Sequence, residues 1–177
     1  MVLVSGLTNR GPPGTVPEGP SKGQIMRPWV CRSSDGATNW EIGHGFPESL
    51  DDTYLARDNA YIPFGNIVQA ADGSLCASAY LKRGVERESY LFRSQDDGRT
   101  WGERAVLNPV GNETAILHLG DGRWLASSRN NHRSSRYQIV ELCVSEDDGK
   151  TWRRDQPLTL PMQVTGHLMR LADGRGM

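Results

Sequence analysis

The feature that most restricts the fold of this 177-residue chain is an eight-residue motif that occurs twice in full. It reads Ser-Gln-Asp-Asp-Gly-Arg-Thr-Trp at 94–101 and Ser-Glu-Asp-Asp-Gly-Lys-Thr-Trp at 145–152, so both copies fit the pattern S-x-D-x-G-x-T-W. A weaker copy at 33–40 keeps the Ser, the first Asp and the Trp, but Ala37 replaces the Gly and Asn39 replaces the Thr. The two full copies begin 51 residues apart, and a motif that recurs at such a period predicts a repeat architecture.

The motif has the chemistry of a tight turn between two strands. An Asp carboxylate accepts hydrogen bonds from backbone N–H groups a few positions further on, and a Gly supplies the positive φ that the turn needs. The Ser and Thr hydroxyls bond the same turn, and the Trp begins the next strand with a large apolar face. We therefore predict a structural role for the ten motif residues, with the two Trp side chains in equivalent buried positions. These residues are Ser94, Asp96, Gly98, Thr100, Trp101, Ser145, Asp147, Gly149, Thr151 and Trp152.

The same motif resembles the Asp-box, or BNR, repeat of the sialidase (neuraminidase) superfamily, and a second marker has a similar period. Asp-Gly pairs at 72–73, 121–122 and 173–174 lie 49 and 52 residues apart, each between two apolar runs, as in a short hairpin. Repeats of about 50 residues built from short strands predict propeller blades, which are four-stranded sheets packed face to face. The expected fold is all-β, a partial β-propeller with about three four-stranded antiparallel blades, and the resemblance implies a six-bladed sialidase-like propeller as the whole.

The predicted blades belong to a single propeller domain over 1–177. Their approximate limits are 1–42 for a partial blade, 60–106 and 112–154 for two full blades, and 164–177 for a second partial blade. Because the chain ends inside the last hairpin, we interpret it as a fragment of a larger propeller.

An open set of blades leaves apolar sheet faces without a neighbour. The last repeat contributes Leu168, Met169 and Leu171 to such a face. Since exposed apolar patches usually find a partner, we expect the isolated chain to be inactive and to associate with itself or to aggregate.

Composition excludes several classes of function. The net charge is −1 and no long run of Lys or Arg occurs, which argues against a nucleic-acid partner. No apolar stretch approaches the roughly 20 residues of a membrane helix, and no signal peptide is visible, so the compartment is not determined. The four His and three Cys lack metal-ligand spacing, and neither a metal nor another cofactor is expected. Cys31 and Cys143 share one repeat position and are expected to be buried strand residues.

Alignment of the repeats on their Asp-Gly pairs indicates where chemistry could occur. Eight residues before the Asp stand Phe64, Glu113 and Thr165, and eight residues after it stand Tyr80 and Arg129. The first strand of a blade starts, and the second ends, at the rim opposite the Asp-Gly turn and the Asp-box. Glu113 and Arg129 are therefore predicted side by side on that rim, facing the central channel, and only the third repeat places charges there.

At this point the resemblance becomes specific. The runs 112–115, 119–123 and 128–130 resemble the sialidase segment in which a Glu is followed sixteen residues later by an Arg across an Asp-Gly hairpin. The resemblance implies that Glu113 is the catalytic Glu that activates a tyrosine nucleophile, and that Arg129 is one of three arginines that bind the sialic acid carboxylate. A guanidinium binds a carboxylate bidentately, and a carboxylate beside a phenol can take its proton. The alternative interpretation is an exposed ion pair that contributes little to stability.

Other parts of the family pattern are missing. The string at 61–63 lacks the Arg of the family's Arg-Ile-Pro phrase, and neither the nucleophilic Tyr nor the two further arginines can be placed. Asp51 and Asp52 are weak candidates for the acid. His167, Tyr80 and Arg133 are predicted to contact the substrate, although Tyr80 could equally be packed, and His118 is expected to be an ordinary strand residue. His132 and Arg136 lie in a loop expected to overhang the site.

Together these features predict an exo-α-sialidase-like glycoside hydrolase that removes terminal sialic acid from glycoconjugates. Its partner would be a sialylated or related acidic glycan. The alternative is a non-catalytic Asp-box propeller that binds glycan or protein on the same rim, because the Asp-boxes alone fit both classes equally.

Overall fold

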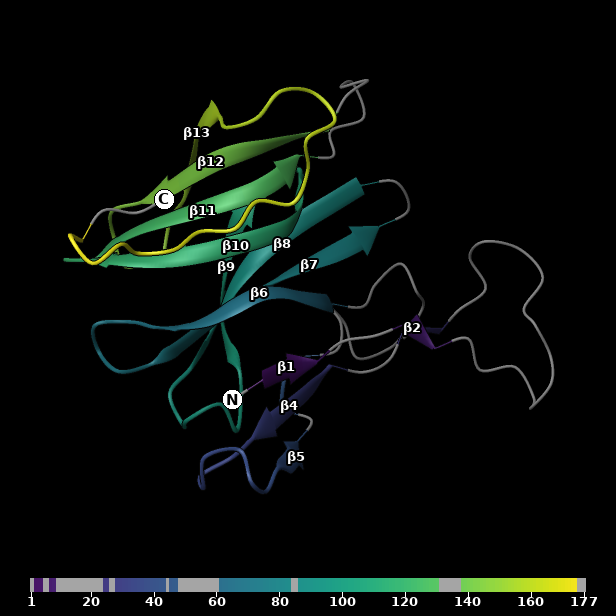
Figure 1. Cartoon of the computed structure of the whole chain (residues 1–177). Coiled ribbons are helices and arrows are strands. Elements are labelled where there is room, and N and C mark those ends of the chain that lie inside the picture. The colour runs from purple at the N-terminus through teal and green to yellow at the C-terminus, as the bar shows by residue number, and fades with distance from the viewer. Residues whose placement is uncertain are drawn as a thin grey trace.

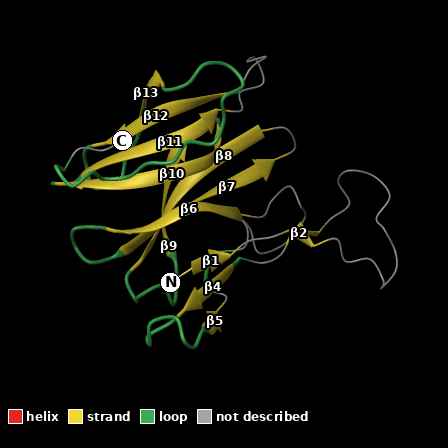
Figure 2. Ribbon diagram, in the orientation of Figure 1, coloured by secondary structure: helices red, strands yellow, loops and turns green. Residues whose placement is uncertain are grey.

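The fold contains only β-strands within the residues that the computed structural model describes (Figure 2). No helix occurs in these residues, and so none in the described part is long and apolar enough to cross a membrane. The predicted all-β class is confirmed. The described residues are 2–4, 7–8, 24–25, 28–43, 45–47, 61–83, 86–130 and 138–174.

Two four-stranded sheets, the second and third in chain order, lie next to each other (Figure 1). In both, each strand pairs antiparallel with its neighbour in the sequence, as expected when short hairpins connect consecutive strands. The second sheet contains β6 (Tyr61–Gln69), β7 (Leu75–Arg83), β8 (Glu86–Ser94) and β9 (Gly102–Asn108). The third sheet contains β10 (Gly111–Gly120), β11 (Arg123–Asn130), β12 (Ile139–Ser145) and β13 (Arg153–Pro157).

A smaller sheet precedes these two in the chain. It has the order β1-β4-β5, and β2 and β3 pair separately as a two-stranded ribbon. The three successive antiparallel sheets make a partial β-propeller. The strands are β1 (Val2–Val4), β2 (Leu7–Thr8), β3 (Gln24–Ile25), β4 (Trp29–Arg32) and β5 (Glu41–Gly43).

Residues 158–174, named the strap here, follow the third sheet. The strap crosses the face of that sheet (Figure 1), and a Cβ added at Gly166 would lie 2.9 Å from Ser127 Oγ and 3.1 Å from Val140 Cγ1. The partial blade predicted over 164–177 would begin with a strand at 166–171, but within the strap only Arg170 makes a β-bridge. The strap therefore approaches the third sheet closely without the ladder of a regular blade strand.

Apolar side chains fill the spaces between consecutive sheets. Between the first and second sheets, Phe46 packs against Phe92 and Trp101 with ring centroids 4.9 and 5.6 Å apart. Trp124, fully buried, belongs to the core between the second and third sheets. A sheet covered on both faces produces the mixed apolar pattern of these strands, since neither face meets water.

The predicted burial of the cysteines holds for one of the two. Cys143 is fully buried and desolvation raises the pKa of its thiol to about 12, whereas Cys31 is half-buried. Cys31 lies in the small first sheet, which has fewer strands to cover it. Both thiols are free.

Several large apolar side chains remain exposed at the two ends of the series of sheets. Trp40 and Ile42 lie at the first sheet, and Leu160, Met162 and Met169 lie on the strap. Leu168 and Leu171 are half-buried instead. Self-association through such faces stays a prediction.

Both full copies of the motif form the same hydrogen-bonded turn. Asp96 Oδ1 accepts from Ser94 Oγ at 2.9 Å and from the Thr100 backbone N–H at 2.8 Å, and Asp96 Oδ2 accepts from Thr100 Oγ1 at 2.7 Å. Asp147 makes the same three bonds in the second copy. These bonds, above all those from the Thr residue, lower the pKa of each Asp carboxyl to about 2.

The two motif tryptophans share a hydrogen bond but differ in burial. Trp101 Nε1 donates to Gly98 O at 3.2 Å, and Trp152 Nε1 donates to Gly149 O at 2.9 Å. Trp101 is buried because Phe46 covers it, whereas Trp152 is half-buried at the edge of the second core. The expectation of equally buried tryptophans is therefore met by Trp101 alone.

The weaker copy builds the same turn with different residues. Asn39 replaces the Thr by donating from its backbone N–H to Asp35 Oδ1 at 2.9 Å and from Nδ2 to Asp35 Oδ2 at 2.6 Å. Ala37 adopts a φ of 69°, close to the 75° of Gly98. The turn is thus present in all three sheets.

A buried arginine connects the turns of the second and third sheets. Arg93 donates to Ser74 Oγ at 2.6 Å, lies 3.5 Å from the Asp72 carboxylate, and contacts Asp148 through its carbonyl at 2.7 Å and its carboxylate at 3.2 Å. Trp124 Nε1 donates to the other Asp148 oxygen at 3.0 Å. Only 9% of the Arg93 side chain is exposed. This cluster joins the sheets at the end that carries the Asp-boxes.

Candidate functional site

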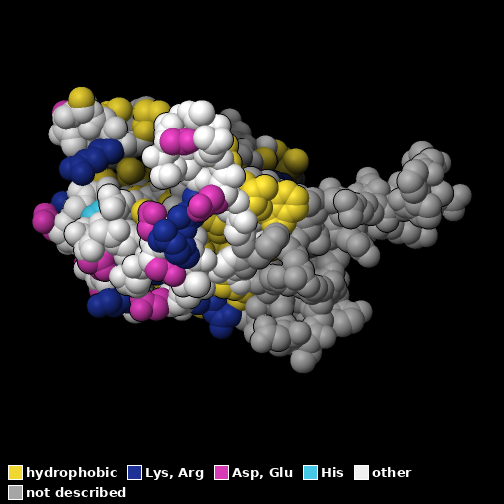
Figure 3. Space-filling view, turned by 90° about the horizontal axis from the view of Figure 1, so that it is seen from below, with side chains coloured by type: hydrophobic (Ala, Val, Ile, Leu, Met, Phe, Trp, Pro, Cys, Tyr) yellow, Lys and Arg dark blue, Asp and Glu magenta, His cyan; other side chains and the backbone are white. Residues whose placement is uncertain are grey.

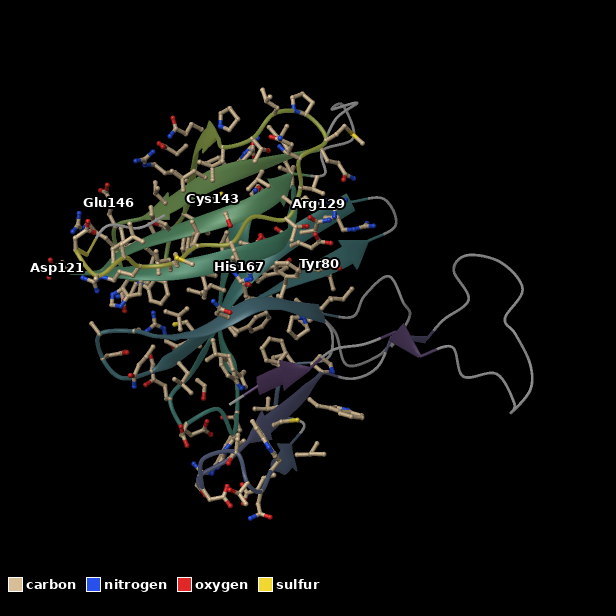
Figure 4. All side chains as sticks on the ribbon, in the orientation of Figure 1. Tyr80, Asp121, Arg129, Cys143, Glu146 and His167 are labelled. Carbon is tan, nitrogen blue, oxygen red and sulfur yellow. The ribbon has the colours of Figure 1, made fainter. Side chains whose placement is uncertain are left out.

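Glu113 and Arg129 lie at the end of the third sheet that is opposite the Asp-boxes. β10 starts and β11 finishes at this end, because the Asp121–Gly122 turn joins the two strands at the other end. Figure 4 shows Arg129 and Tyr80 at one end of the sheets, with Asp121 and Glu146 at the opposite end. The predicted separation between the repeated turns and the charged pair is present.

A β-bulge brings Glu113 beside Arg129. Gly111 pairs with Asn130 and Thr114 pairs with Ser128, so β10 uses one residue more than β11 over this interval. The Asn112 side-chain oxygen accepts a hydrogen bond from the Glu113 backbone N–H at 2.7 Å. Bulges redirect side chains at sheet ends, and this one aims Glu113 across the hairpin.

The two charges form a direct ion pair that also includes an amide. Arg129 Nη1 donates to Glu113 Oε2 at 2.9 Å, while Arg129 Nε donates to Gln138 Oε1 at 3.0 Å and Nη2 contacts the same oxygen. The side chains of Arg129 and Glu113 are 21% and 24% exposed. Among the described residues these bonds occupy one N–H on each guanidinium nitrogen, which leaves one N–H on Nη1 and one on Nη2 for an anionic ligand.

Glu113 is held through one of its two oxygens. Thr165 Oγ1, from the strap, donates to Glu113 Oε2 at 2.8 Å, so both described hydrogen bonds to this carboxylate end on Oε2. Oε1 accepts none from the described residues. A carboxylate anchored in this way can present its second oxygen to a reacting proton.

A buried network of hydrogen-bonded side chains lies next to the bulge. Asn108 Nδ2 donates to Ser128 Oγ at 3.0 Å, and Ser128 Oγ lies 2.9 Å from Thr114 Oγ1. All three side chains are almost completely buried, and they come from β9, β11 and β10. Gly111 is required here, since a Cβ would lie 2.2 Å from Ser128 Oγ. The network therefore fixes the strand positions on either side of Glu113 and Arg129.

Tyr80 adds a neutral phenol near the pair. It lies in β7, near the end of the corresponding strand of the second sheet, and is half-buried. Burial, followed by the Glu113 carboxylate, raises the pKa of Tyr80 above its ordinary 10, and the charges of Arg87 and Arg129 oppose this shift. Tyr80 is thus protonated at neutral pH and can donate a hydrogen bond.

The comparisons with known proteins decide the family. A family model described as a BNR repeat-like domain matches residues 15–176, which is most of the chain. The chain belongs to the BNR repeat-like family. No curated protein matches it.

Solved structures share the fold of this BNR repeat-like chain. A protein of unknown function from Dyadobacter fermentans DSM 18053 has a TM-score of 0.71 and 19% identity over 98% of this chain and 51% of that chain. The Hadza microbial sialidase Hz136 has a TM-score of 0.59 and 19% identity over 76% of this chain and 31% of that chain. The chain therefore spans about half of the first and a third of the second. These structural matches confirm the partial propeller fold, and the family match confirms the predicted BNR repeat.

The remaining predicted site residues of this BNR repeat-like chain are not all brought to the pair. His167 is exposed on the strap and makes no hydrogen bond with the described residues. His118 stacks on Trp124 with ring centroids 4.6 Å apart, away from Glu113. Four candidates lie outside the described residues: Asp51, Asp52, His132 and Arg136. The predicted substrate contact Arg133 also lies outside them.

Within the described part of the chain no cluster of metal ligands occurs, and the one face drawn in Figure 3 has mixed charge. No group of three His, Cys, Asp or Glu side chains in this part could hold a metal ion. The face shown in Figure 3 places Lys and Arg side chains next to Asp and Glu. The half-buried ion pair of Glu113 and Arg129 is therefore the candidate site in this part of the chain.

Sequence reasoning found this pair but missed the groups around it. Gln138 and Asn108 carry no motif that distinguishes them from ordinary strand or loop residues, and Thr114 and Ser128 lie in the matched runs but were given no role of their own. Only the repeat alignment singled out Thr165, as the counterpart of Glu113, and it suggested no contact between them.

Proposed function

We propose that the chain carries part of the active site of a sialidase-like glycoside hydrolase that releases terminal sialic acid from glycoconjugates. The observation that carries the proposal is the ion pair of Glu113 and Arg129 at the end of the third sheet, where the corresponding positions of the second sheet are Phe64 and Tyr80. The similarity of the fold to a protein named as a sialidase supports it.

Arg129 is suited to hold the carboxylate of the sugar. The N–H groups left on Nη1 and Nη2 can bind two carboxylate oxygens, and the bonds to Gln138 and Glu113 keep the guanidinium in place. Glu113 also offsets part of the Arg129 charge, and this lowers the repulsion between Arg129 and further cationic groups of the complete site.

Glu113 is suited to accept a proton through Oε1. In tyrosine-nucleophile sialidases a carboxylate takes the phenol proton, and the phenolate oxygen attacks the anomeric carbon while the bond to the aglycone oxygen breaks and a general acid protonates that oxygen. Water then hydrolyses the bond between the sugar and the tyrosine. Tyr80, whose pKa is raised, is assigned to hydrogen bonding with the substrate instead.

The test measures hydrolysis of a fluorogenic sialoside by a complete propeller that includes this chain and by matched variants of it. Replacing Glu113 with Gln should reduce kcat by about 10²- to 10⁴-fold, the usual contribution of a positioned acid or base, and leave sialic acid binding measurable. Replacing Arg129 with Ala should weaken both binding and turnover. The controls are Glu146→Gln and Arg123→Ala, which change the same residue types at the Asp-box end.

The results separate two classes of function. Full activity of Glu113→Gln would show that the role assigned to Glu113 is wrong. Binding of sialylated glycan that depends on Arg129, with no turnover by the unmodified protein, would identify a non-catalytic glycan-binding propeller instead.

A further inference from the structure

Thr165 has the most unusual backbone near the candidate site. Seven described residues other than Gly have positive φ, and three of them are Asp, a residue type that tolerates this region. Thr165 has a φ of 71° and is the β-branched residue among the seven. A β-branched residue in this region is a conformational outlier, and such outliers concentrate at functional sites.

The next residue explains how this conformation is maintained. Gly166 lies so close to the third sheet that an added Cβ would be 2.9 Å from Ser127 Oγ and 3.1 Å from Val140 Cγ1. Hydrogen bonds also tie the strap to β12 before Thr165, from Leu158 N–H to Val140 O and from Met162 N–H to Gln138 O, both 2.8 Å. The strap is therefore fixed at several points, and Thr165 has little freedom to relax.

The strained residue points its hydroxyl at the candidate catalytic carboxylate. Thr165 Oγ1 donates to Glu113 Oε2 at 2.8 Å, and Arg129 Nη1 donates to the same oxygen at 2.9 Å. Thr165 and Glu113 occupy the same position in successive repeats, so one repeat reaches back to the site of the repeat before it.

We infer that Thr165 is a positioning residue that decides which oxygen of Glu113 is held by the protein and which one reacts. Its hydroxyl and Arg129 anchor Oε2, and Oε1 is thereby directed toward the substrate. This inference rests on the function proposed for Glu113. Thr165 acts through Glu113 and does not itself contact the reacting atoms.

The first test separates the hydroxyl from the shape of the side chain. Thr165→Val keeps the branched shape but removes the donor, and it should lower kcat about ten- to a hundredfold with KM little changed, because a hydrogen bond to a charged group is lost. Thr165→Ser keeps the donor and should restore most of the turnover. A merely structural role would make the two variants equal in kcat.

The second test measures the strain without using activity. Thr165→Gly should raise the melting temperature above that of Thr165→Val, since both variants lack the hydroxyl and only Gly adopts positive φ freely, yet both should lose turnover. The matched control is Met162→Gly on the same strap, where φ is 70° and the side chain is 69% exposed. That control should also raise the melting temperature but keep full turnover.

The outcomes distinguish this inference from the proposed function. Loss of activity in Glu113→Gln with full activity in Thr165→Val overturns the inference and leaves the proposed function intact. A melting temperature of Thr165→Gly no higher than that of Thr165→Val overturns the strain argument, whatever the activity. Unchanged activity in Glu113→Gln overturns both.

Discussion

The residues at one end of the sheets repeat from sheet to sheet, whereas those at the other end differ. At one end, all three sheets close with the same Asp-centred turn, even though the first uses Ala37 and Asn39 where the others use Gly and Thr. At the other end, the third sheet has Glu113 and Arg129 where the second has Phe64 and Tyr80. A turn is stabilised by residues that are close in sequence, so it can be repeated, whereas a binding site requires one particular set of groups from several strands.

The end with the Asp-boxes is therefore expected to control stability, and the opposite end activity. The comparison fails if a mutation at the Asp-box end lowers the activity of the folded protein, or if a mutation at the opposite end acts mainly on stability.

The largest loss of stability is expected from Arg93→Met. This change removes the buried cation that contacts Asp148 and Asp72 and leaves both carboxylates without a positive charge beside them, which should cost about 3 kcal/mol of unfolding free energy. Urea denaturation measures it, with the exposed Arg123→Met as the control, expected within about 0.5 kcal/mol of the unmodified protein. Activity per folded molecule should not change. A kcat that falls in Arg93→Met would contradict the separation of the two ends.

A pH-dependent effect is expected from Asp147→Asn. The folded pKa of Asp147 is about 2, below its ordinary 3.8, so the charged carboxylate stabilises the fold above about pH 4, and this contribution is lost as the pH falls toward 2. The variant should be less stable at pH 7 and should lose less stability between pH 4 and pH 2. Thermal melts of both proteins across this range measure the difference. Parallel curves would show that the turn hydrogen bonds contribute nothing through this carboxylate.

The smallest effect is expected from Ala37→Gly. Ala37 has a φ of 69°, where an L side chain is strained, but Gly loses more backbone entropy on folding, so the net gain should be about 0.5 kcal/mol. The reciprocal change, Gly98→Ala at a φ of 75°, should lose about 1 kcal/mol. Differential scanning calorimetry measures both. Loss of stability in Ala37→Gly would show that the weaker turn is not strained.

The sequence predicted most of what depends on local chemistry. The motif residues gave the turns, the Asp-Gly pairs gave the hairpins, and the repeat alignment placed Glu113 beside Arg129. The family match and the all-β fold confirm the architecture, while the roles of the two charges remain proposals.

Features that depend on contacts between distant segments were not predictable. The bulge that aims Glu113 follows from the Asn108, Ser128 and Thr114 network across two sheets, and these residue types are common in any strand. The expected strand at 166–171 is mostly absent because close packing of Gly166 on the third sheet takes the place of a regular ladder. Trp152 is less buried than Trp101 because Phe46 packs on Trp101, and the motif does not determine that contact.

The most direct test of the central claim is a crystal structure of the protein with an unsaturated sialic acid analogue bound. The account predicts that the analogue lies at the end of the third sheet opposite the Asp-boxes, with its carboxylate about 2.7–2.9 Å from the Arg129 terminal nitrogens and Glu113 Oε1 facing its ring. An analogue bound at the Asp-box end, or bound with its carboxylate turned away from Arg129, would contradict the account.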